Sequence, residues 1–386
     1  MSTLQLAFYL AFKEIWRNRG RFFLVSLVIA LITLLVLFIA ALGEGLANGN
    51  KQYISNLDAQ FIVFLEKSDY IISSSRIESS TVRAIRRVDA VDAAGPIYTS
   101  VTEIVSTAKP LKVSLLAAEP GQPGTPGVIT GRAYRGGDSR EAVIDRNIAL
   151  RTGIQVGDEI RFRSVQGTDD QFFNLKVVGL TEGQSYLFQP TIFVAPSSWE
   201  HIRPQSAADQ QDDTPFANIV AVRLRPGVSA ESARRDLLAR VQSIEIADIN
   251  TTIANIPGYS AQQSTVQTQA FFTLLIGILV IGGFFQIQVL QKVPQIGVLK
   301  AIGSSNASVG AASVIQIVVI TALGVTIGGA FTYLFSLGFP PSIPLVFNGA
   351  RSLLAILALT LIGPAGGLVS VIYAIRIEPL KALRLQ

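Results

Sequence analysis

Long uncharged stretches dominate the pattern of apolar and polar positions along the chain. About 20 residues of helix, each rising about 1.5 Å, cross the hydrocarbon of a bilayer. Each uncharged stretch of that length therefore predicts one membrane-spanning helix. The predicted spans cover residues 22–43, 265–291, 306–335 and 353–375.

The third uncharged stretch is too long for a single span. No charged residue occurs from Ala301 to Ala350, and prolines stand at positions 340, 341 and 344. Because proline removes a backbone donor and interrupts a helix, these prolines predict an outer hairpin over residues 336–352. The fourth span is expected to bend at Gly363-Pro364 for the same reason.

The first residues of the chain have helical spacing of apolar side chains and a basic end. We interpret residues 1–21 as an N-terminal amphipathic helix on the cytosolic membrane surface. Its predicted membrane-surface anchor consists of Trp16, Arg17, Arg19 and Arg21. The alternative is a cleavable signal peptide, whose basic residues precede an apolar core of about 7–15 residues. Here the apolar core follows the arginines, runs from Phe22 to Leu42 and is not followed by an Ala-x-Ala site.

Residues 44–264, between the first two spans, have the composition of a domain outside the membrane. Apolar runs of strand length alternate there with short helical patterns, in the order β-α-β, insertion, β-α-β. The insertion, residues 128–195, is predicted to be a β-rich subdomain. The predicted fold class is therefore an α-helical membrane protein with four transmembrane helices plus an α+β extracytoplasmic domain.

Capping and turn residues place the elements of this domain more closely. A Ser75-x-x-Glu78 capping box predicts a helix that ends near Arg87, and Ser229 predicts the start of the second helix. Residues 119–127 contain three prolines and three glycines, so they predict a linker that is neither helix nor strand.

Charge is unevenly distributed along the 386 residues. Residues 44–264 hold 22 Lys and Arg against 25 Asp and Glu, whereas the rest holds 10 against 2. The excess cations lie at 13–21, 292–300 and 376–384, beside the spans. The positive-inside rule therefore places both termini and the 376–386 tail in the cytosol, with the 44–264 domain extracytoplasmic. The predicted location is the bacterial cell (inner) membrane, as a multi-pass protein.

Composition excludes several classes of function. The chain is 49% hydrophobic and 15% charged, with no cysteine, one histidine (His201) and one methionine. We therefore expect neither disulfides nor a metal site. No P-loop, G-x-S-x-G or H-E-x-x-H motif occurs, so no catalytic residue is assigned. The spans contain no Lys, Arg, Asp or Glu, which argues against an ion-coupled secondary transporter. The confinement of basic residues to the flanks of the spans argues against nucleic acid as a partner.

Residues 292–305, which follow the second span, form a candidate coupling segment. Apolar side chains alternate there with Lys292 and Lys300, and Gly297 and Gly303 bracket a piece of helix length. Such a surface is suited to a groove on a partner protein. The candidate residues for coupling to an ATPase are Lys292, Gln295, Ile296, Gly297, Val298, Leu299, Lys300, Ala301, Ile302 and Gly303. The alternative is a basic loop adsorbed to anionic lipid, with an attraction of about 1 kcal/mol per lysine.

Three further features have open interpretations. Glu44, next to the outer end of the first span, is a candidate substrate contact, and the alternative is a wetted residue at headgroup depth. Gly324 and Gly328 are predicted to mediate helix packing, either within one subunit or between two. The acidic residues between 138 and 159 lack metal-site spacing and are interpreted as a solvated β face.

The order of these segments and three local motifs resemble the MacB/FtsX-type (type VII) permeases of ABC transporters. IGVLKAIGSS at 296–305 resembles the coupling segment of that family, EIG-x-x-(K/R)-A-x-G-A/S. The end of the chain, at 377–384, resembles its closing P-x-x-A-L-R, and IPGY at 256–259 is similar to the smaller haem- and glycolipid-exporter-like permeases. Two positions differ from the family, which often has Glu in place of Gln295 and Arg in place of Lys292.

The resemblance implies a permease subunit without a fused ATPase. The expected assembly has two copies of a cytosolic ABC ATPase, which would bind ATP and Mg, and a second copy of this chain. This chain would bind no cofactor and would not itself be an enzyme. It would couple ATP hydrolysis to movement of its extracytoplasmic domain and to extrusion of a hydrophobic or amphipathic substrate. Further expected partners are the lipid bilayer and a periplasmic adaptor or outer-face protein. The alternative is an FtsX-like transmembrane signal transmitter that activates an extracytoplasmic partner without transport.

Overall fold

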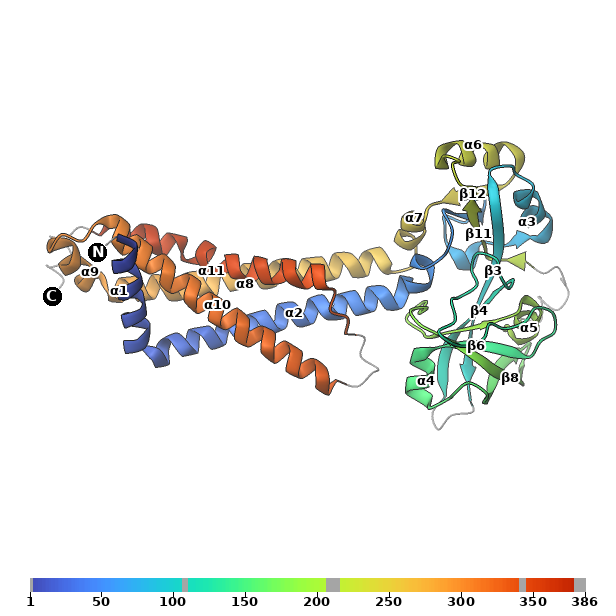
Figure 1. The fold of residues 1–386 in the computed structure, drawn as a ribbon, viewed down its shortest axis with the longest axis horizontal. Coiled ribbons are helices and arrows are strands. Elements are labelled where there is room, and N and C mark those ends of the chain that lie inside the picture. Colours follow the sequence, from blue (N-terminus) through green and yellow to red (C-terminus); the bar gives the residue numbers. More distant parts are fainter. Residues whose placement is uncertain (1–2, 106–109, 206–215, 340–344, 378–386) are drawn as a thin grey trace. The chain divides into compact units, whose positions relative to one another are not determined.

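The computed structural model describes residues 3–105, 110–205, 216–339 and 345–377. The chain divides into two compact units, which differ in their secondary structure (Figure 1). One comprises residues 1–45 and 263–386 and is called here the helical unit. The other comprises residues 46–262 and is called the sheet unit.

Long apolar helices form the helical unit. Its described helices, two of which continue into the sheet unit, are α1 (Thr3–Arg17), α2 (Arg19–Ser55), α8 (Tyr259–Gln291), α9 (Val293–Ala301), α10 (Asn306–Gly338) and α11 (Gly349–Arg376). Of these, α2, α8, α10 and α11 are long and apolar enough to cross a membrane, which confirms the prediction of four such helices. Pro364 lies inside α11. The hairpin prolines and the tail from residue 378 lie outside the described residues.

The predicted N-terminal helix ends earlier than expected. α1 stops at Arg17 and α2 starts at Arg19, so Arg19 and Arg21 belong to the first turn of the first spanning helix. The N–H groups of Arg21 and Phe22 donate to the carbonyl of Asn18, where the chain turns from α1 into α2. Asn and Gly are weak helix formers, which explains a break in the sequence Asn18-Arg-Gly20.

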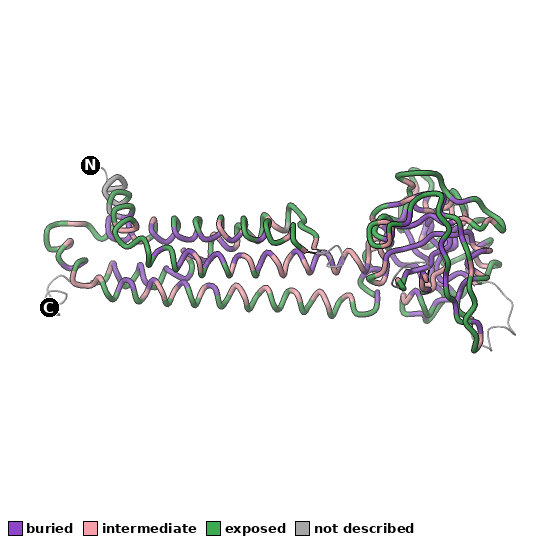
Figure 2. Tube along the Cα trace, turned by 90° about the horizontal axis from the view of Figure 1, so that it is seen from below, coloured by how far each residue is buried: buried purple, intermediate pink, exposed green. Residues whose placement is uncertain are grey.

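Each long helix has both a buried and an exposed side (Figure 2). The exposed sides carry large apolar residues, such as Phe23 and Leu31 on α2 and Phe271 and Leu279 on α8. Such surfaces are unfavourable in water and favourable against acyl chains. The exposed apolar sides therefore fit a helical unit that is solvated by lipid.

Glycines allow close approach between the spanning helices. A Cβ atom on Gly324 would lie 2.8 Å from the carbonyl oxygen of Ser26, and one on Gly328 would lie 2.5 Å from that of Ala30. Gly324 and Gly328 therefore pack α10 against α2 of the same chain, as expected for small residues one turn apart in a membrane. Of the two open interpretations, the structure supports packing within one subunit.

The sheet unit contains a ten-stranded sheet in the order β12-β1-β11-β3-β4-β9-β6-β8-β5, with β7 paired to β3 and β8. Its strands are β1 (Phe61–Leu65), β3 (Val91–Ile104), β4 (Leu111–Ala118), β5 (Thr130–Gly131), β6 (Glu141–Asp145), β7 (Glu159–Gln166), β8 (Asp169–Thr181), β9 (Thr191–Val194), β11 (Ile219–Leu224) and β12 (Ile244–Ala247). A separate pair joins β2 (Ile77–Glu78) to β10 (Phe216–Ala217). The described helices are η1 (Ile72–Ser74), α3 (Ser79–Arg86), α4 (Arg146–Thr152), α5 (Pro196–Ile202), α6 (Ala230–Arg240) and α7 (Ile249–Ala254).

The predicted pair of β-α-β halves is confirmed. β1, α3 and β3 form one half, β11, α6 and β12 form the other, and their strands run in the order β12-β1-β11-β3, with every pair antiparallel. Because successive side chains of a strand point to opposite faces, the two sides of β1 join different cores. Phe61 and Val63 pack with α3 and α6, whereas Ile62 and Phe64 pack with Tyr53 of α2.

The insertion is rich in strands, as predicted, and these strands are continuous with the rest of the sheet. Strands β5 to β9 lie within residues 128–195, but β9 pairs with β4, so the sheet is continuous across the boundary. The core under these strands also includes Ile104 and Val113, from outside the insertion. The insertion therefore extends the sheet and does not form a β domain with its own sheet.

Two capping predictions have different outcomes. Ser229 caps α6 by accepting a hydrogen bond from the N–H of Ser232, as predicted. Ser75 does not cap α3, because it is buried and its hydroxyl accepts from the N–H of Leu65 at 2.9 Å. The α3 helix instead starts at Ser79, after Glu78, whose carboxylate accepts from Ser80.

The Pro- and Gly-rich stretch at 119–127 contains no described helix or strand, in agreement with the sequence. It is nevertheless packed tightly against the sheet. The hydroxyl of Tyr53 donates to the carbonyl of Gly124 at 3.1 Å, and a Cβ on Gly95 would collide with the carbonyl oxygen of Pro123. The stretch therefore covers the sheet as an ordered loop.

Candidate functional site

The candidate coupling segment forms a short helix between two long ones. Lys292 precedes α9, and Pro294 occupies its first turn, where a missing N–H is tolerated. Gly303 ends the segment with φ at +102°, a conformation that glycine adopts without strain. Ser305 then caps α10 by accepting from the N–H of Ser308. The sequence thus starts and stops a separate helix between the second and third spans.

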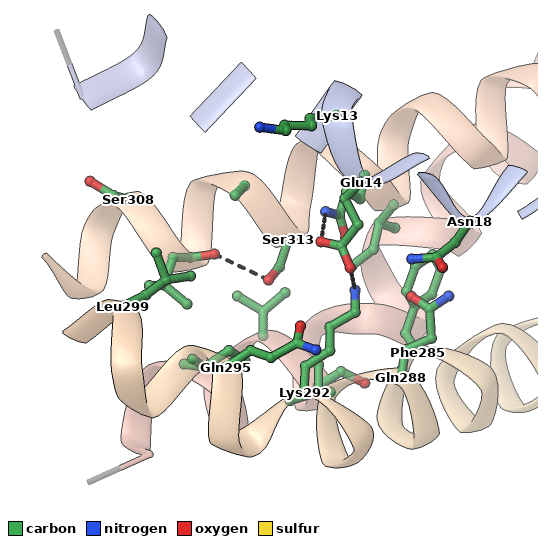
Figure 3. Close-up of a pocket in the computed structure, with 18 of the residues that line it drawn as sticks. Lys13, Glu14, Asn18, Phe285, Gln288, Lys292, Gln295, Leu299, Ser308 and Ser313 are labelled. Carbon is green, nitrogen blue, oxygen red and sulfur yellow. Dashed lines mark hydrogen bonds and ion pairs between the residues drawn. The ribbon is translucent and has the colours of Figure 1, made fainter. Parts of the chain in front are cut away.

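An ion pair joins the start of this segment to α1. The ammonium of Lys292 pairs with the carboxylate of Glu14, which also accepts a hydrogen bond from the amide of Gln316 at 2.8 Å. Glu14 belongs to α1, Gln316 belongs to α10, and Lys292 lies at the junction of α8 with α9. Figure 3 shows the side chains of Glu14 and Lys292 pointing toward one another. The pair therefore fixes α1 to the bundle at the coupling segment.

Lys300 holds the other end of α9. Its ammonium donates to the carbonyls of Ile375 and Ile377, at 2.6 and 3.0 Å. The last carbonyls of a helix carry partial negative charge, so a cation is favourable at this end of α11. Burial lowers the pKa of the Lys300 ammonium from its ordinary value. Both lysines of the segment are thus directed to groups within the chain.

The remaining residues of the segment divide into an inner and an outer side. Ile296 and Gly297 are buried, and Lys292, Leu299 and Lys300 are partly buried. The exposed residues are Gln295, Val298, Ala301, Ile302 and Gly303. Ile302 has an exposed fraction of 76%, which is unusual for a large aliphatic side chain in water. We call the exposed residues Gln295, Val298, Ala301 and Ile302 the outer face of α9.

A cavity of about 340 Å³ lies between α1 and α9, extends to α8, α10 and α11, and includes the Glu14–Lys292 pair (Figure 3). Its lining contains polar and charged side chains, including Lys13, Glu14, Arg17, Gln288, Lys292 and Gln295. Its apolar lining includes Phe285 and Val289 of α8 and Val309 of α10. The cavity is therefore amphipathic.

The sequence interpretation missed Glu14, which makes the central contact of this site. A signal was present, because only two acidic residues occur outside 44–264, and Glu14 lies inside a cationic flank. An isolated carboxylate among cations is more favourable when it is paired than when it is solvated alone.

The predicted surface anchor lies at the same end of the helical unit. Trp16 is 68% exposed, and its ring stacks on Phe12 with centroids 6.3 Å apart. Arg17 and Arg19 are exposed, and Arg21 lies over the ring of Phe284 at 5.8 Å. An exposed aromatic pair beside cations is the composition of a helix at a membrane interface.

The side chain of Glu44 is buried, whereas a residue wetted by water at headgroup depth would be exposed. Its exposed fraction is 7%, on the part of α2 that ends the helical unit. Gly43 beside it contacts Val266 of α8 so closely that a Cβ would lie 2.7 Å from that side chain. A buried carboxylate at such a place is a functional candidate, because burying a charge is costly.

The acidic residues of the insertion have different environments. Among the described residues, no group of three His, Cys, Asp or Glu side chains is arranged to hold a metal ion. Asp145 is fully buried, contrary to the predicted solvated face, and caps α4 by accepting from the N–H of Asn147. His201 is exposed, and its Nδ1 lies 2.7 Å from the carbonyl oxygen of Ser197.

Comparison with known proteins covers nearly the whole chain. Residues 22–240 match the family model of the MacB-like periplasmic core domain, and residues 268–379 match that of the FtsX-like permease C-terminal region. Proteins named as a hemin transport system permease, HrtB, from Staphylococcus haemolyticus and Staphylococcus epidermidis are each 23% identical over 377 residues. These alignments cover 97% of this chain and 98% of each relative.

Two solved structures are similar to part of the chain. The extracellular domain of the ABC-type transporter YknZ from Gram-positive bacteria is 13% identical, with a TM-score of 0.34, and covers 49% of this chain and 100% of its own. The periplasmic region of MacB from Actinobacillus actinomycetemcomitans is 14% identical, with a TM-score of 0.38, and covers 53% and 97%. With the MacB-like model matching more than half of its length, this chain belongs to the MacB/FtsX-type family of ABC transporter permeases.

Proposed function

We propose that α9 is the docking element for a separate cytosolic ABC ATPase and that this permease extrudes a hydrophobic or amphipathic substrate. In this proposal two copies of the chain assemble with two copies of the ATPase, which binds ATP and Mg. Both termini and α9 lie in the cytosol, and the sheet unit lies outside the cell membrane. The basic flanks of the spans support this orientation.

The observation that carries the proposal is the outer face of α9. Lys292 and Lys300 fix both ends of the segment to the bundle, while Val298 and Ile302 remain exposed. An apolar helix face that is held rigidly at the end of a membrane bundle fits insertion into a groove of a partner. A loop adsorbed to lipid through its lysines would instead direct both ammonium groups outward.

Two long helices provide the path for transmission. The boundaries between the helical and sheet units fall inside α2, after Gly45, and inside α8, after Gln262. A continuous helix transmits displacement along its axis because its hydrogen bonds lie within the segment. A motion imposed on α9 would reach α8 directly and would reach α2 through α1, which is held by Glu14.

The proposed cargo is hydrophobic or amphipathic, because the predicted spans carry no Lys, Arg, Asp or Glu with which to conduct ions. Hemin is the first molecule to test, since the curated relatives are named for hemin transport. Glu44 is the proposed substrate contact in the helical unit. Loss of hemin-stimulated ATP hydrolysis in Glu44→Gln, with basal hydrolysis retained, is the result expected for that role.

The docking proposal is tested by placing a charge on the outer face of α9. We expect Val298→Glu and Ile302→Glu to lower ATP hydrolysis by the reconstituted complex of permease and ATPase at least about tenfold, because a carboxylate in an apolar contact is costly to desolvate. The matched control is Leu238→Glu, which alters an exposed leucine of α6 in the sheet unit. ATP hydrolysis by Val298→Glu and Ile302→Glu at the rate of the Leu238→Glu control would contradict docking at α9.

The same complex separates transport from signalling. Cargo depletion from proteoliposomes that depends on ATP supports export. Hydrolysis coupled to movement of the sheet unit, without depletion of any amphipathic compound, would instead support the signal-transmitter function.

A further inference from the structure

We propose that the cavity between α1 and α9 binds the phosphate-bearing headgroup of an anionic phospholipid from the adjacent leaflet. The cavity shares only Gln295 with the outer face of α9, and the apolar residues of that face, Val298 and Ile302, which the proposed ATPase would contact, do not line it. The proposal therefore does not depend on the identity of the ATPase. It assigns the cavity as a lipid site at the membrane surface.

The charge of the lining favours an anion. Lys13, Arg17 and Lys292 line the cavity together with one carboxylate, that of Glu14. Glu14 is already engaged by Lys292 and by Gln316. Lys13, whose ammonium lies 3.3 Å from the hydroxyl of Tyr9, and Arg17 are exposed one helical turn apart. Basic pockets between spanning helices at the membrane surface are typical binding sites for anionic headgroups.

An amide in the wall offers hydrogen bonds to a polar ligand. Gln288 is 3% exposed and lines the cavity (Figure 3). An amide at a cavity wall can donate two hydrogen bonds and accept two. A phosphate or ester oxygen of a bound lipid would accept from the Gln288 amide.

The size and apolar lining identify a lipid rather than a soluble phosphate. A volume of about 340 Å³ lies near the lower limit of ligand sites, about 300–1,000 Å³, and suits a headgroup rather than a whole lipid. Phe285, Val289 and Val309 offer apolar surface to the first carbons of acyl chains. On the same helix as Lys13, the exposed ring of Trp16 is typical of the headgroup region.

The test measures lipid binding to the full-length protein in detergent, by native mass spectrometry during titration with phosphatidylglycerol or phosphatidylcholine. We expect phosphatidylglycerol to bind at least about tenfold more tightly. Arg17→Gln should weaken it about fivefold, which corresponds to about 1 kcal/mol for one cation near a lipid headgroup. Gln288→Leu should weaken it by a similar factor. The matched control is Arg19→Gln, which removes an exposed cation that does not line the cavity.

Several results would overturn the proposal. Equal binding of the two lipids would show that the headgroup charge is not recognised. An Arg19→Gln effect as large as that of Arg17→Gln would show general surface attraction. Inorganic phosphate or glycerol phosphate that displaces the lipid at millimolar concentration would identify a soluble phosphate as the ligand. Arg17 is exposed, so its variant keeps the test valid even if Gln288→Leu folds poorly.

Discussion

At the scale of single residues, the two lysines of the coupling segment have partners inside the chain. Lys292 pairs with Glu14, and Lys300 donates to the carbonyls that end α11. Their charge is therefore used to position α9 and not to contact another protein. In the proposed docking, recognition of the ATPase would then depend on the apolar outer face. This explains how the segment can have Gln295 at a position where the resembling family often has Glu.

A pH dependence is predicted for one residue of the sheet unit. The guanidinium of Arg132 bonds both carboxylate oxygens of Glu141 and lowers the pKa of Glu141 to about 2, from an ordinary value of 4.5. A lowered carboxyl pKa contributes stability that is present above pH about 4.5 and is lost as the pH falls toward 2. Glu141→Gln should therefore lower the free energy of unfolding at pH 7 by about 0.5–1 kcal/mol, the value of a solvent-screened pair.

The two tryptophans allow this change to be measured locally. Trp199 is buried in the same core as Ala142 and Ile144 of β6, the strand that Glu141 begins. Its fluorescence in a Trp16→Phe background, which removes the second tryptophan, therefore reports unfolding of the sheet unit. The difference in the free energy of unfolding between the unchanged protein and Glu141→Gln should disappear near pH 2. A control, Glu182→Gln, alters an exposed pair with Arg146 and should have a smaller effect at pH 7. A difference that stays constant from pH 7 to pH 2 would contradict the ionic origin.

At the scale of secondary-structure elements, glycines determine which helices meet. Gly324 and Gly328 bring α10 onto α2, and Gly282 meets Gly366 where α8 crosses α11. A Cβ at either of the last two positions would lie within 2.7 Å of a backbone oxygen on the other helix. Lipid tails offer no hydrophobic driving force for helix association, so contact of this kind stabilises the bundle.

Two adjacent glycines of α10 provide a matched test of this packing. Gly328→Ala should destabilise the helical unit by about 1–3 kcal/mol, because its methyl group would lie 2.5 Å from the carbonyl oxygen of Ala30. Gly329 has no atom within 4 Å of such a methyl group, so Gly329→Ala should be neutral or stabilising by up to about 1 kcal/mol. Thermal unfolding in detergent measures both. Equal melting temperatures would show that the α2–α10 contact does not limit stability.

The elements also show what sequence alone can predict. Span length and hydropathy are properties of consecutive residues, so the four long helices and the two β-α-β halves could be predicted. Contacts between residues that are distant in the sequence could not be predicted. Ser75 has the spacing of a capping box, but its hydroxyl accepts from Leu65, and the glycine pattern at Gly324 does not specify which helix it contacts. The ion pair of Glu14 with Lys292 likewise arises only when α1 folds against the bundle.

At the scale of the whole molecule, the distribution of charge predicts which residues lie on each side of the membrane. The charge imbalance gives a definite expectation, because residues 44–264 have more acidic than basic residues and the flanks of the spans are basic. The alternative orientation would place those basic flanks outside the cell. It would also separate the outer face of α9 from any ATPase in the cytosol.

The chain contains no cysteine, so its sidedness can be measured with single introduced cysteines. Ile302→Cys on α9 and Leu238→Cys on α6 both replace exposed side chains, which makes their intrinsic reactivity comparable. The cell envelope outside the cell membrane is first made permeable, while the cell membrane itself stays closed. A membrane-impermeant maleimide should then label Leu238→Cys and spare Ile302→Cys. Permeabilising the cell membrane should then expose Ile302→Cys as well, because the basic flanks of the spans predict that α9 lies on the cytosolic side. The candidate span between these two positions is α8. Labelling of both cysteines from the same side would therefore mean that α8 does not cross the membrane. An ATPase at α9 could not then drive a sheet unit across the bilayer.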